Sequence, residues 1–115
     1  ANTEEGVKVK SNGAVELFYN NSKKFETRSD GVDIHGLAEV NGDVRPNLNN
    51  THDLGTSSLR WANVFTNDLN LSNEGGSNDV DGTWGNYTIQ EGSEDLFLIN
   101  QRNGKKYKFV LQEVS

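Results

Sequence analysis

RNGKKYKFVL, residues 102–111, contains an Asn-Gly pair followed by lysines that alternate with aromatic and aliphatic residues. Asn-Gly is a strong signal for a two-residue hairpin turn, because both residues accept the positive φ angles of a type I′ turn. Alternation with a period of two is typical of a β-strand. The stretch therefore predicts a C-terminal hairpin formed by residues 95–100 and 105–113.

A two-residue turn at Asn103-Gly104 fixes the expected register of this hairpin. It pairs Leu98 with Phe109 on one face and Phe97 with Val110 on the other, so both faces are expected to carry apolar side chains. A small meander covers at most one face with its own chain, and the second face needs another layer. A symmetry-related copy of the chain is the simplest cover. The alternative is a monomeric sandwich in which upstream strands cover that face.

The composition of the chain excludes several classes of protein. Only 32% of the 115 residues are hydrophobic, which leaves little material for a core. The net charge of −6 argues against binding to nucleic acid, which requires clustered lysine and arginine. No apolar run approaches the about 18 residues of a membrane span, so no membrane insertion is expected. The chain has no cysteine, and disulfides and thiolate metal sites are therefore absent.

Short alternating runs separated by Asn, Gly, Asp and Ser predict an all-β chain with antiparallel strands. Beyond the hairpin, strands are expected at residues 14–19, 24–28, 32–35, 37–40, 61–66, 68–72 and 83–91. Asn20-Asn21-Ser22 is an expected turn. Thr56 could cap a single helical turn ahead of Trp61, and residues 72–82 have the composition of an acidic loop.

Three stretches carry a resemblance to a known family. They are NGAVELFYNNSKKFET (residues 12–27), DLGTSSLRWANVFT (residues 53–66), and the terminal module that begins WGNYTIQEG at residue 84 and ends with GKKYKF at residue 109. Together they resemble modules that recur in the tail-fibre proteins of bacteriophages, notably those of marine and cyanobacterial hosts.

The resemblance implies a homotrimeric fibre end on a virion, with three intertwined chains and a C-terminal antiparallel meander. It implies a β-rich shaft-like segment at residues 1–48, a connector at 49–72 and a tip at 73–115, all part of a longer polypeptide. Self-cleavage, known in some relatives, is not carried over, because the chain runs on into the terminal meander instead. The residues expected at the trimer interface are Phe97, Ile99, Val110, Trp61 and Phe65.

The expected meander brings the acidic loop and the Arg102-Asn103-Gly104 turn to the same end of the sheet. An aromatic platform beside polar donors and acceptors is typical of a sugar-binding surface. The candidate receptor-binding residues are Trp84, Tyr87, Asn78, Asp79, Asp81, Arg102, Asn103 and Lys105. The alternative is that Trp84 and Tyr87 are ordinary core or interface aromatics.

The sequence gives weaker support for a metal site, a calcium loop or an enzymatic site. Asp33 and His35 share one face of an expected strand. Three copies around an axis could bind a metal, but a histidine without a metal is the commoner arrangement, so neither a metal nor a cofactor is expected. Residues 78–82 fit the spacing of a helix-loop-helix calcium site poorly, although a looser calcium site is left open. Glu91, Glu94 and Asp95 crowd one turn rather than flanking a cleft, and no enzymatic activity or catalytic residue is expected.

We therefore expect the chain to mediate adsorption to a bacterial surface receptor, either a carbohydrate or an outer-membrane protein. The alternative is a structural shaft and trimerisation module, with receptor binding located elsewhere.

Overall fold

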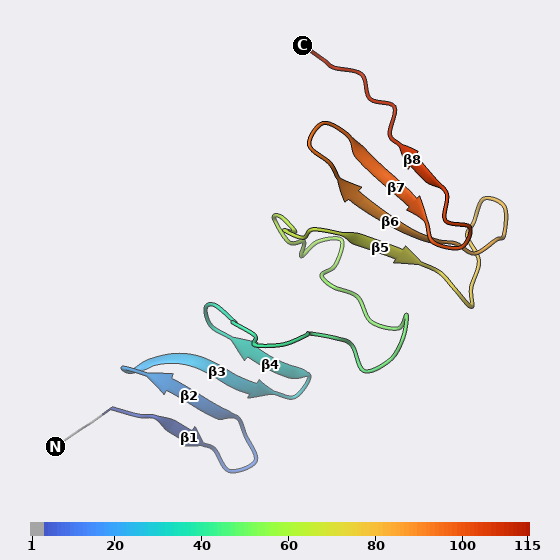
Figure 1. Cartoon of the computed structure of the whole chain (residues 1–115). Coiled ribbons are helices and arrows are strands. Elements are labelled where there is room, and N and C mark those ends of the chain that lie inside the picture. The colour runs from blue at the N-terminus through green and yellow to red at the C-terminus, as the bar shows by residue number, and fades with distance from the viewer. Residues whose placement is uncertain (1–3) are drawn as a thin grey trace. The chain divides into compact units, whose positions relative to one another are not determined.

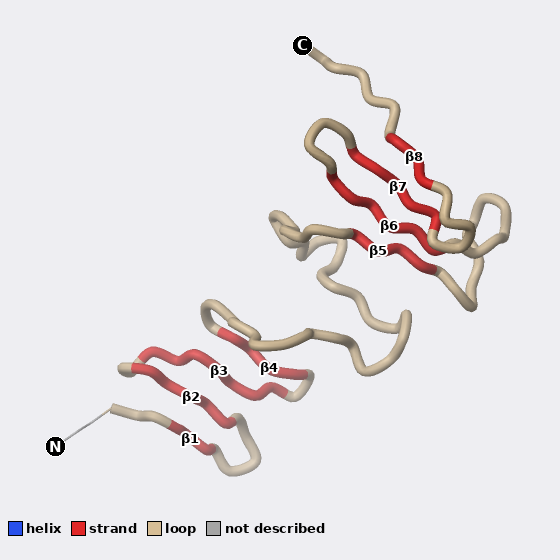
Figure 2. Tube along the Cα trace, viewed as in Figure 1, coloured by secondary structure: helices blue, strands red, loops and turns tan. Residues whose placement is uncertain are grey.

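The computed structural model describes residues 4–115, and all regular secondary structure in that range is β-strand (Figure 2). The chain divides into two units, one ending at His52 and the other beginning at Asp53. Each unit contains one four-stranded antiparallel sheet with its strands in chain order (Figure 1). The all-β prediction is thus confirmed. No helix that could cross a bilayer is found among the described residues.

The N-terminal sheet is built from short hairpins. Its strands are β1 (Val7–Val9), β2 (Val15–Tyr19), β3 (Ser22–Arg28) and β4 (Gly31–Ile34). Asn20 and Asn21 join β2 to β3 with φ angles of 50° and 61°, the two positive values that a type I′ turn requires. The predicted turn is confirmed here. β1 was not predicted from the sequence, because Val7-Lys8-Val9 is too short to establish a period.

A β-bulge in β3 sets which side chains share a face of this sheet. Glu16 pairs with Glu26, but Phe18 pairs with Lys23, so Lys24 is an extra residue on β3. One extra residue reverses the alternation beyond it. Lys23 therefore lies on the same face as Glu26 instead of the opposite one.

The two faces of the N-terminal sheet differ sharply in polarity. Cross-strand pairs place one apolar set together, namely Val7, Val9, Val15, Leu17, Phe25, Val32 and Ile34. The opposite face carries mostly charged groups, namely Lys8, Glu16, Lys23, Glu26, Arg28 and Asp33. The apolar face remains open, since Val7 is 65% exposed and Val9 is 73% exposed.

The C-terminal sheet contains the predicted hairpin and one more strand than the predicted meander. Its strands are β5 (Leu69–Ser72), β6 (Asn86–Glu91), β7 (Leu96–Asn100) and β8 (Lys106–Lys108). β5 pairs with β6, which places Leu71 beside Tyr87 and Asn70 beside Thr88. The long loop between β5 and β6 contains the predicted acidic loop.

The predicted register of the last hairpin is wrong by two residues. Leu98 pairs with Tyr107 and Phe97 with Lys108, rather than with Phe109 and Val110. Gly104 has a φ of 76°, whereas Asn103 has no positive φ, so a type I′ turn does not form. The Asn103 side chain instead accepts a hydrogen bond from the backbone N–H of Lys105 (2.9 Å), and a longer loop results.

The C-terminal sheet has one apolar face and one mixed face. The apolar face comprises Leu69, Leu71, Tyr87, Ile89, Leu96, Leu98 and Tyr107. On the other face Phe97 and Ile99 lie among polar partners, namely Asn70, Thr88, Gln90, Lys106 and Lys108. The expectation that both faces are apolar is therefore met on one face only.

No strand forms in the chain between β4 and β5. The strands predicted at residues 37–40 and 61–66 are absent, because no neighbouring strand pairs with either segment. The predicted helical turn is absent too. The Thr56 hydroxyl accepts from the Leu59 N–H (2.9 Å) and the Thr56 N–H donates to the Leu59 carbonyl (2.9 Å), which closes a tight loop. Phe65 stands 93% exposed in this segment.

Within residues 4–115 no hydrophobic side chain is buried, and only Glu16 and Thr88 are buried at all. The accessible surface is 10790 Å². Two separate compact domains of these lengths would together expose roughly 7,500 Å². Each sheet is thus a single layer without the second layer that a stable β domain requires. A single chain leaves both apolar faces in contact with water.

Candidate functional site

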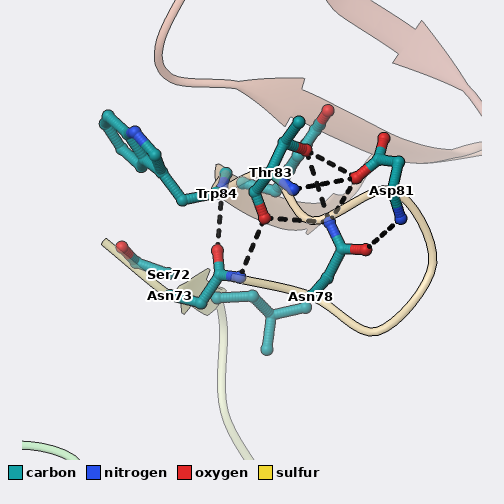
Figure 3. A pocket seen from close by; sticks show the side chains of 9 residues that line it. Ser72, Asn73, Asn78, Asp81, Thr83 and Trp84 are labelled. Atoms are coloured by element: carbon teal, nitrogen blue, oxygen red, sulfur yellow. Dashed lines mark hydrogen bonds between the residues drawn. The ribbon is translucent and has the colours of Figure 1, made fainter. Parts of the chain in front are cut away.

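The main candidate site is a groove of about 470 Å³ beside the loop that joins β5 to β6 (Figure 3). The end of β5, the loop and the start of β6 each contribute to its wall. The lining residues are Leu71, Ser72, Asn73, Asn78, Asp81, Thr83, Trp84, Gly85 and Tyr87. The groove combines two aromatic rings with amide, hydroxyl and carboxylate groups.

Asn78 organises the acidic loop around itself. Its Oδ1 accepts from the backbone N–H groups of Val80 (2.8 Å) and Asp81 (2.9 Å). Its Nδ2 donates to Asp81 Oδ1 (2.7 Å) and to the Thr83 carbonyl (2.9 Å). A loop lacks the backbone hydrogen bonds that join neighbouring strands, and these side-chain hydrogen bonds hold the backbone in their place. The loop therefore has a defined shape without strands of its own.

Asp81 accepts both the backbone and the side-chain donor of Thr83. Its Oδ1 accepts from the Thr83 hydroxyl (2.7 Å) and from the Thr83 N–H (3.1 Å), in addition to Asn78. The hydroxyl of Thr83 and the amide of Asn78 lower the pKa of the Asp81 carboxyl below its ordinary value, because they stabilise the charged form. Asp81 is thus a fixed negative charge at the edge of the groove.

Asn73 ties the other side of the groove to the start of β6. Its Oδ1 accepts from the Gly85 N–H (2.7 Å), and its own N–H donates to the Gly85 carbonyl (3.3 Å). Gly85 leaves room for the Tyr87 ring, since a Cβ at this position would stand 2.9 Å from a ring carbon. A side chain at position 85 would therefore have to displace the Tyr87 ring from the groove.

Trp84 stands beside this polar network rather than within it. Figure 3 shows its indole projecting away from Asn78, Asp81 and Thr83. The Arg102 guanidinium lies 3.6 Å from the centre of the Trp84 ring, and its Nη1 donates to the Trp84 carbonyl (2.9 Å). This stacking is a cation–π contact. It joins the β7–β8 turn to the start of β6.

The predicted proximity of the acidic loop and the Arg102 turn is confirmed. Trp84, Tyr87, Asn78 and Asp81 line the main groove. A second groove of about 420 Å³ shares Trp84 and Tyr87 and adds Arg102 and Asn103. Asp79 and Lys105 line neither of these two grooves.

Sequence reasoning missed five members of the groove, namely Leu71, Ser72, Asn73, Thr83 and Gly85. Leu71 and Asn73 were missed because the pairing of β5 with β6 was not predicted. Thr83 was read only as the first residue of a strand. An Asn-x-x-Asp-x-Thr pattern in a loop of small polar residues is the signal that could have identified the network.

The residues predicted for the trimer interface lie in different environments. Phe97 is 37% exposed on the mixed face of the C-terminal sheet, with Ile99 beside it on that face. Val110 is 98% exposed beyond the end of β8, and Trp61 is 65% exposed in the connecting segment before β5. Each could meet another chain, and the interface stays a prediction.

The acidic loop does not resemble a calcium site in its hydrogen bonding. Asp81 Oδ1 is already occupied by three donors from Asn78 and Thr83, and the Asn78 Oδ1 accepts two backbone N–H groups. A calcium ion needs such oxygens free to face it. The network is better understood as the structure that shapes the groove.

Comparisons with known proteins identify no relative of this chain. No family model, no curated protein and no solved structure matches it.

Proposed function

We propose that this chain is the C-terminal region of a bacteriophage tail fibre and that it mediates adsorption to a glycan on the bacterial surface. The resemblance of residues 12–27, 53–66 and 84–109 to tail-fibre modules supports the assignment to a fibre. The observation that carries the binding proposal is the groove in which Trp84 stands beside the fixed Asn78, Asp81 and Thr83 network.

The chemistry of the groove suits a sugar. The C–H groups of a pyranose pack on an aromatic ring, while its hydroxyls bond to carboxylate, amide and guanidinium groups. Arg102 covers one face of the indole, so a sugar would meet the opposite face of Trp84 or the guanidinium itself. The loop is already ordered by its own hydrogen bonds, and little entropy is lost when a ligand binds.

An open groove of this kind binds a single sugar weakly. The proposed homotrimer presents three grooves to one surface, and their combined avidity exceeds the affinity of each site by a factor on the order of 100 or more. The proposed location is the tip of the fibre on the virion.

Labelling of bacteria with a fluorescent fusion of the full chain tests the proposal. A panel of strains is compared with their lipopolysaccharide-truncated derivatives. We expect the wild-type protein to label at least one smooth strain and Trp84→Ala to reduce the labelling about tenfold or more. His52→Ala is the control, an exposed ring outside both sheets, and should label normally. Equal labelling by Trp84→Ala would contradict the proposal.

A structural role is the second candidate, and the uncovered sheets favour it. Within residues 4–115 no hydrophobic side chain is buried, which suits a module whose main task is to hold several chains together. Removal of the second unit, residues 53–115, separates the candidates. If the shortened protein still forms trimers but no longer adsorbs, the second unit is a receptor tip. If trimers are lost, that unit is a clamp.

A further inference from the structure

We infer that the charged face of the N-terminal sheet contains a binding site for a zinc ion, formed by Glu26, Asp33 and His35. One ligand atom from each of these residues lies within 4.8 Å of the other two. The inference does not depend on the groove of the C-terminal sheet or on the adsorption proposal.

The fold itself brings the three side chains together. Glu26 on β3 is the direct cross-strand partner of Asp33 on β4, so both side chains point to the same face. His35 follows two residues later, and its backbone N–H donates to the carbonyl of Lys24 (2.9 Å). This bond extends the pairing of β4 by one residue and keeps His35 in register with Asp33. The anchoring carbonyl belongs to the bulge residue of β3.

Neighbouring cations hold one oxygen of each carboxylate. Lys23 Nζ donates to Glu26 Oε2 (2.7 Å), and Arg28 Nη1 donates to Asp33 Oδ1 (3.1 Å). The other Glu26 oxygen, Oε1, lies 4.0 Å from His35 Nε2. Carboxylates that bind metals are commonly oriented by such outer hydrogen bonds. Here the outer bonds leave one oxygen of Glu26 directed at the imidazole.

The charge balance of this face also allows a cation. Besides Glu26, Lys23 forms an ion pair with Glu16 (3.1 Å). Besides Asp33, Arg28 forms an ion pair with Asp30 (3.1 Å). Each positive side chain near the cluster thus faces two carboxylates. Glu16 also pairs with Lys10 (2.6 Å), so the four carboxylates of this network exceed its three cations by one, and the net negative charge attracts a divalent ion.

The ligand set favours zinc over the harder cations. Zinc binds imidazole nitrogen and carboxylate oxygen, and its open sites combine three protein ligands with one water, whereas calcium takes about 6–8 oxygen ligands. Zinc bonds of about 2.0–2.2 Å require the ligand atoms to approach by roughly 1 Å. His35 can make this adjustment, because its side chain is 47% exposed.

Titration calorimetry with zinc chloride on the full chain, without a histidine tag, tests the site. We expect one zinc ion per chain and a zinc-dependent rise in the melting temperature that EDTA reverses. His35→Ala and Asp33→Asn should each weaken zinc binding by about tenfold or more and abolish the rise in melting temperature.

Two matched variants control for the loss of a histidine or of a carboxylate. His52→Ala removes the other histidine of the chain, and Asp43→Asn removes an exposed carboxylate of the segment that follows β4. Both should bind zinc as the wild type does. Absence of saturable binding, unchanged binding by His35→Ala, binding that depends on His52, or a preference for calcium would each overturn the inference.

Discussion

Glu16 shows, at the scale of single residues, that the buried side chains of residues 4–115 are polar rather than apolar. It is 3% exposed and is paired with Lys10 (2.6 Å) and Lys23 (3.1 Å). Hydrogen bonds from Lys10 and Lys23 lower the pKa of the Glu16 carboxyl below its ordinary value. Burial opposes this effect, but the two ammonium groups outweigh it.

This pairing predicts acid sensitivity. A carboxyl whose folded pKa is lowered contributes stability above its unfolded pKa of about 4.5, and that contribution is lost as the pH falls through the folded value. The melting temperature of the wild-type protein should therefore fall below about pH 4.5. Glu16→Gln should be less stable at neutral pH and less sensitive to acid. Glu39→Gln, at an exposed carboxyl, should reproduce the wild-type acid profile.

Arg102 is the second residue with a specific predicted role. Its stacking on Trp84 and its bond to the Trp84 carbonyl should stabilise the C-terminal sheet by about 1 kcal/mol. Urea denaturation of Arg102→Ala should show this loss. Lys105→Ala changes the same turn but lines neither groove, and should stay within about 0.5 kcal/mol of the wild type. Equal losses in the two variants would contradict the role of Arg102.

At the scale of elements, local turn chemistry explains what the sequence could and could not predict. Asn20 and Asn21 form the turn expected at residues 20–22 because both residues adopt positive φ. Asn103-Gly104 does not, since the Asn100 and Asn103 side chains bond to nearby backbone N–H groups and Arg102 is held on Trp84. The two asparagine bonds each span two residues, but the contact between Arg102 and Trp84 joins residues 18 apart, which a turn rule cannot include.

Which side chains of neighbouring strands share a face of the N-terminal sheet could not be predicted from the sequence either. The bulge at Lys24 reverses the alternation in β3, and no residue type announces a bulge there. The sequence predicts that Asp33 and His35 share a face, but only the register of β3 with β4 shows that Glu26 lies beside them. The groove was easier to predict, because the topology of a meander places the acidic loop and the Arg102 turn at one end.

Gly104 provides a test of the observed loop. Alanine would have to adopt a φ of 76°, which costs about 1–2 kcal/mol for a residue with a Cβ. Gly104→Ala should therefore lower the free energy of unfolding by about that amount. Gly76→Ala is the control in the same unit, because Gly76 has no positive φ and its Cβ would meet only one backbone oxygen, at 3.4 Å. A neutral Gly104→Ala would contradict the loop conformation.

At the scale of the whole molecule, each sheet exposes an apolar face that one chain does not cover. We propose that copies of the chain cover these faces, and the resemblance to tail fibres indicates three copies. The composition predicts a thin core. It does not predict that the described part of the chain buries no apolar side chain at all. That outcome depends on how the strands pair, not on the count of apolar residues.

Substitution on the open apolar face tests this proposal. Val32 is 52% exposed on β4, so glutamate fits there without a clash within the chain. Between chains it would bury an unpaired charge. Val32→Glu should therefore prevent assembly, as judged by sedimentation velocity. Ser29→Glu, at the exposed turn between β3 and β4, should assemble normally. Assembly of Val32→Glu at wild-type concentrations would show that this face is not an interface.

The mass of the purified 115-residue protein in solution tests the central claim most directly. Size-exclusion chromatography with multi-angle light scattering should give a mass of three chains that persists on dilution. A single chain that stays monomeric and unfolds cooperatively would contradict the claim that these open sheets require partners.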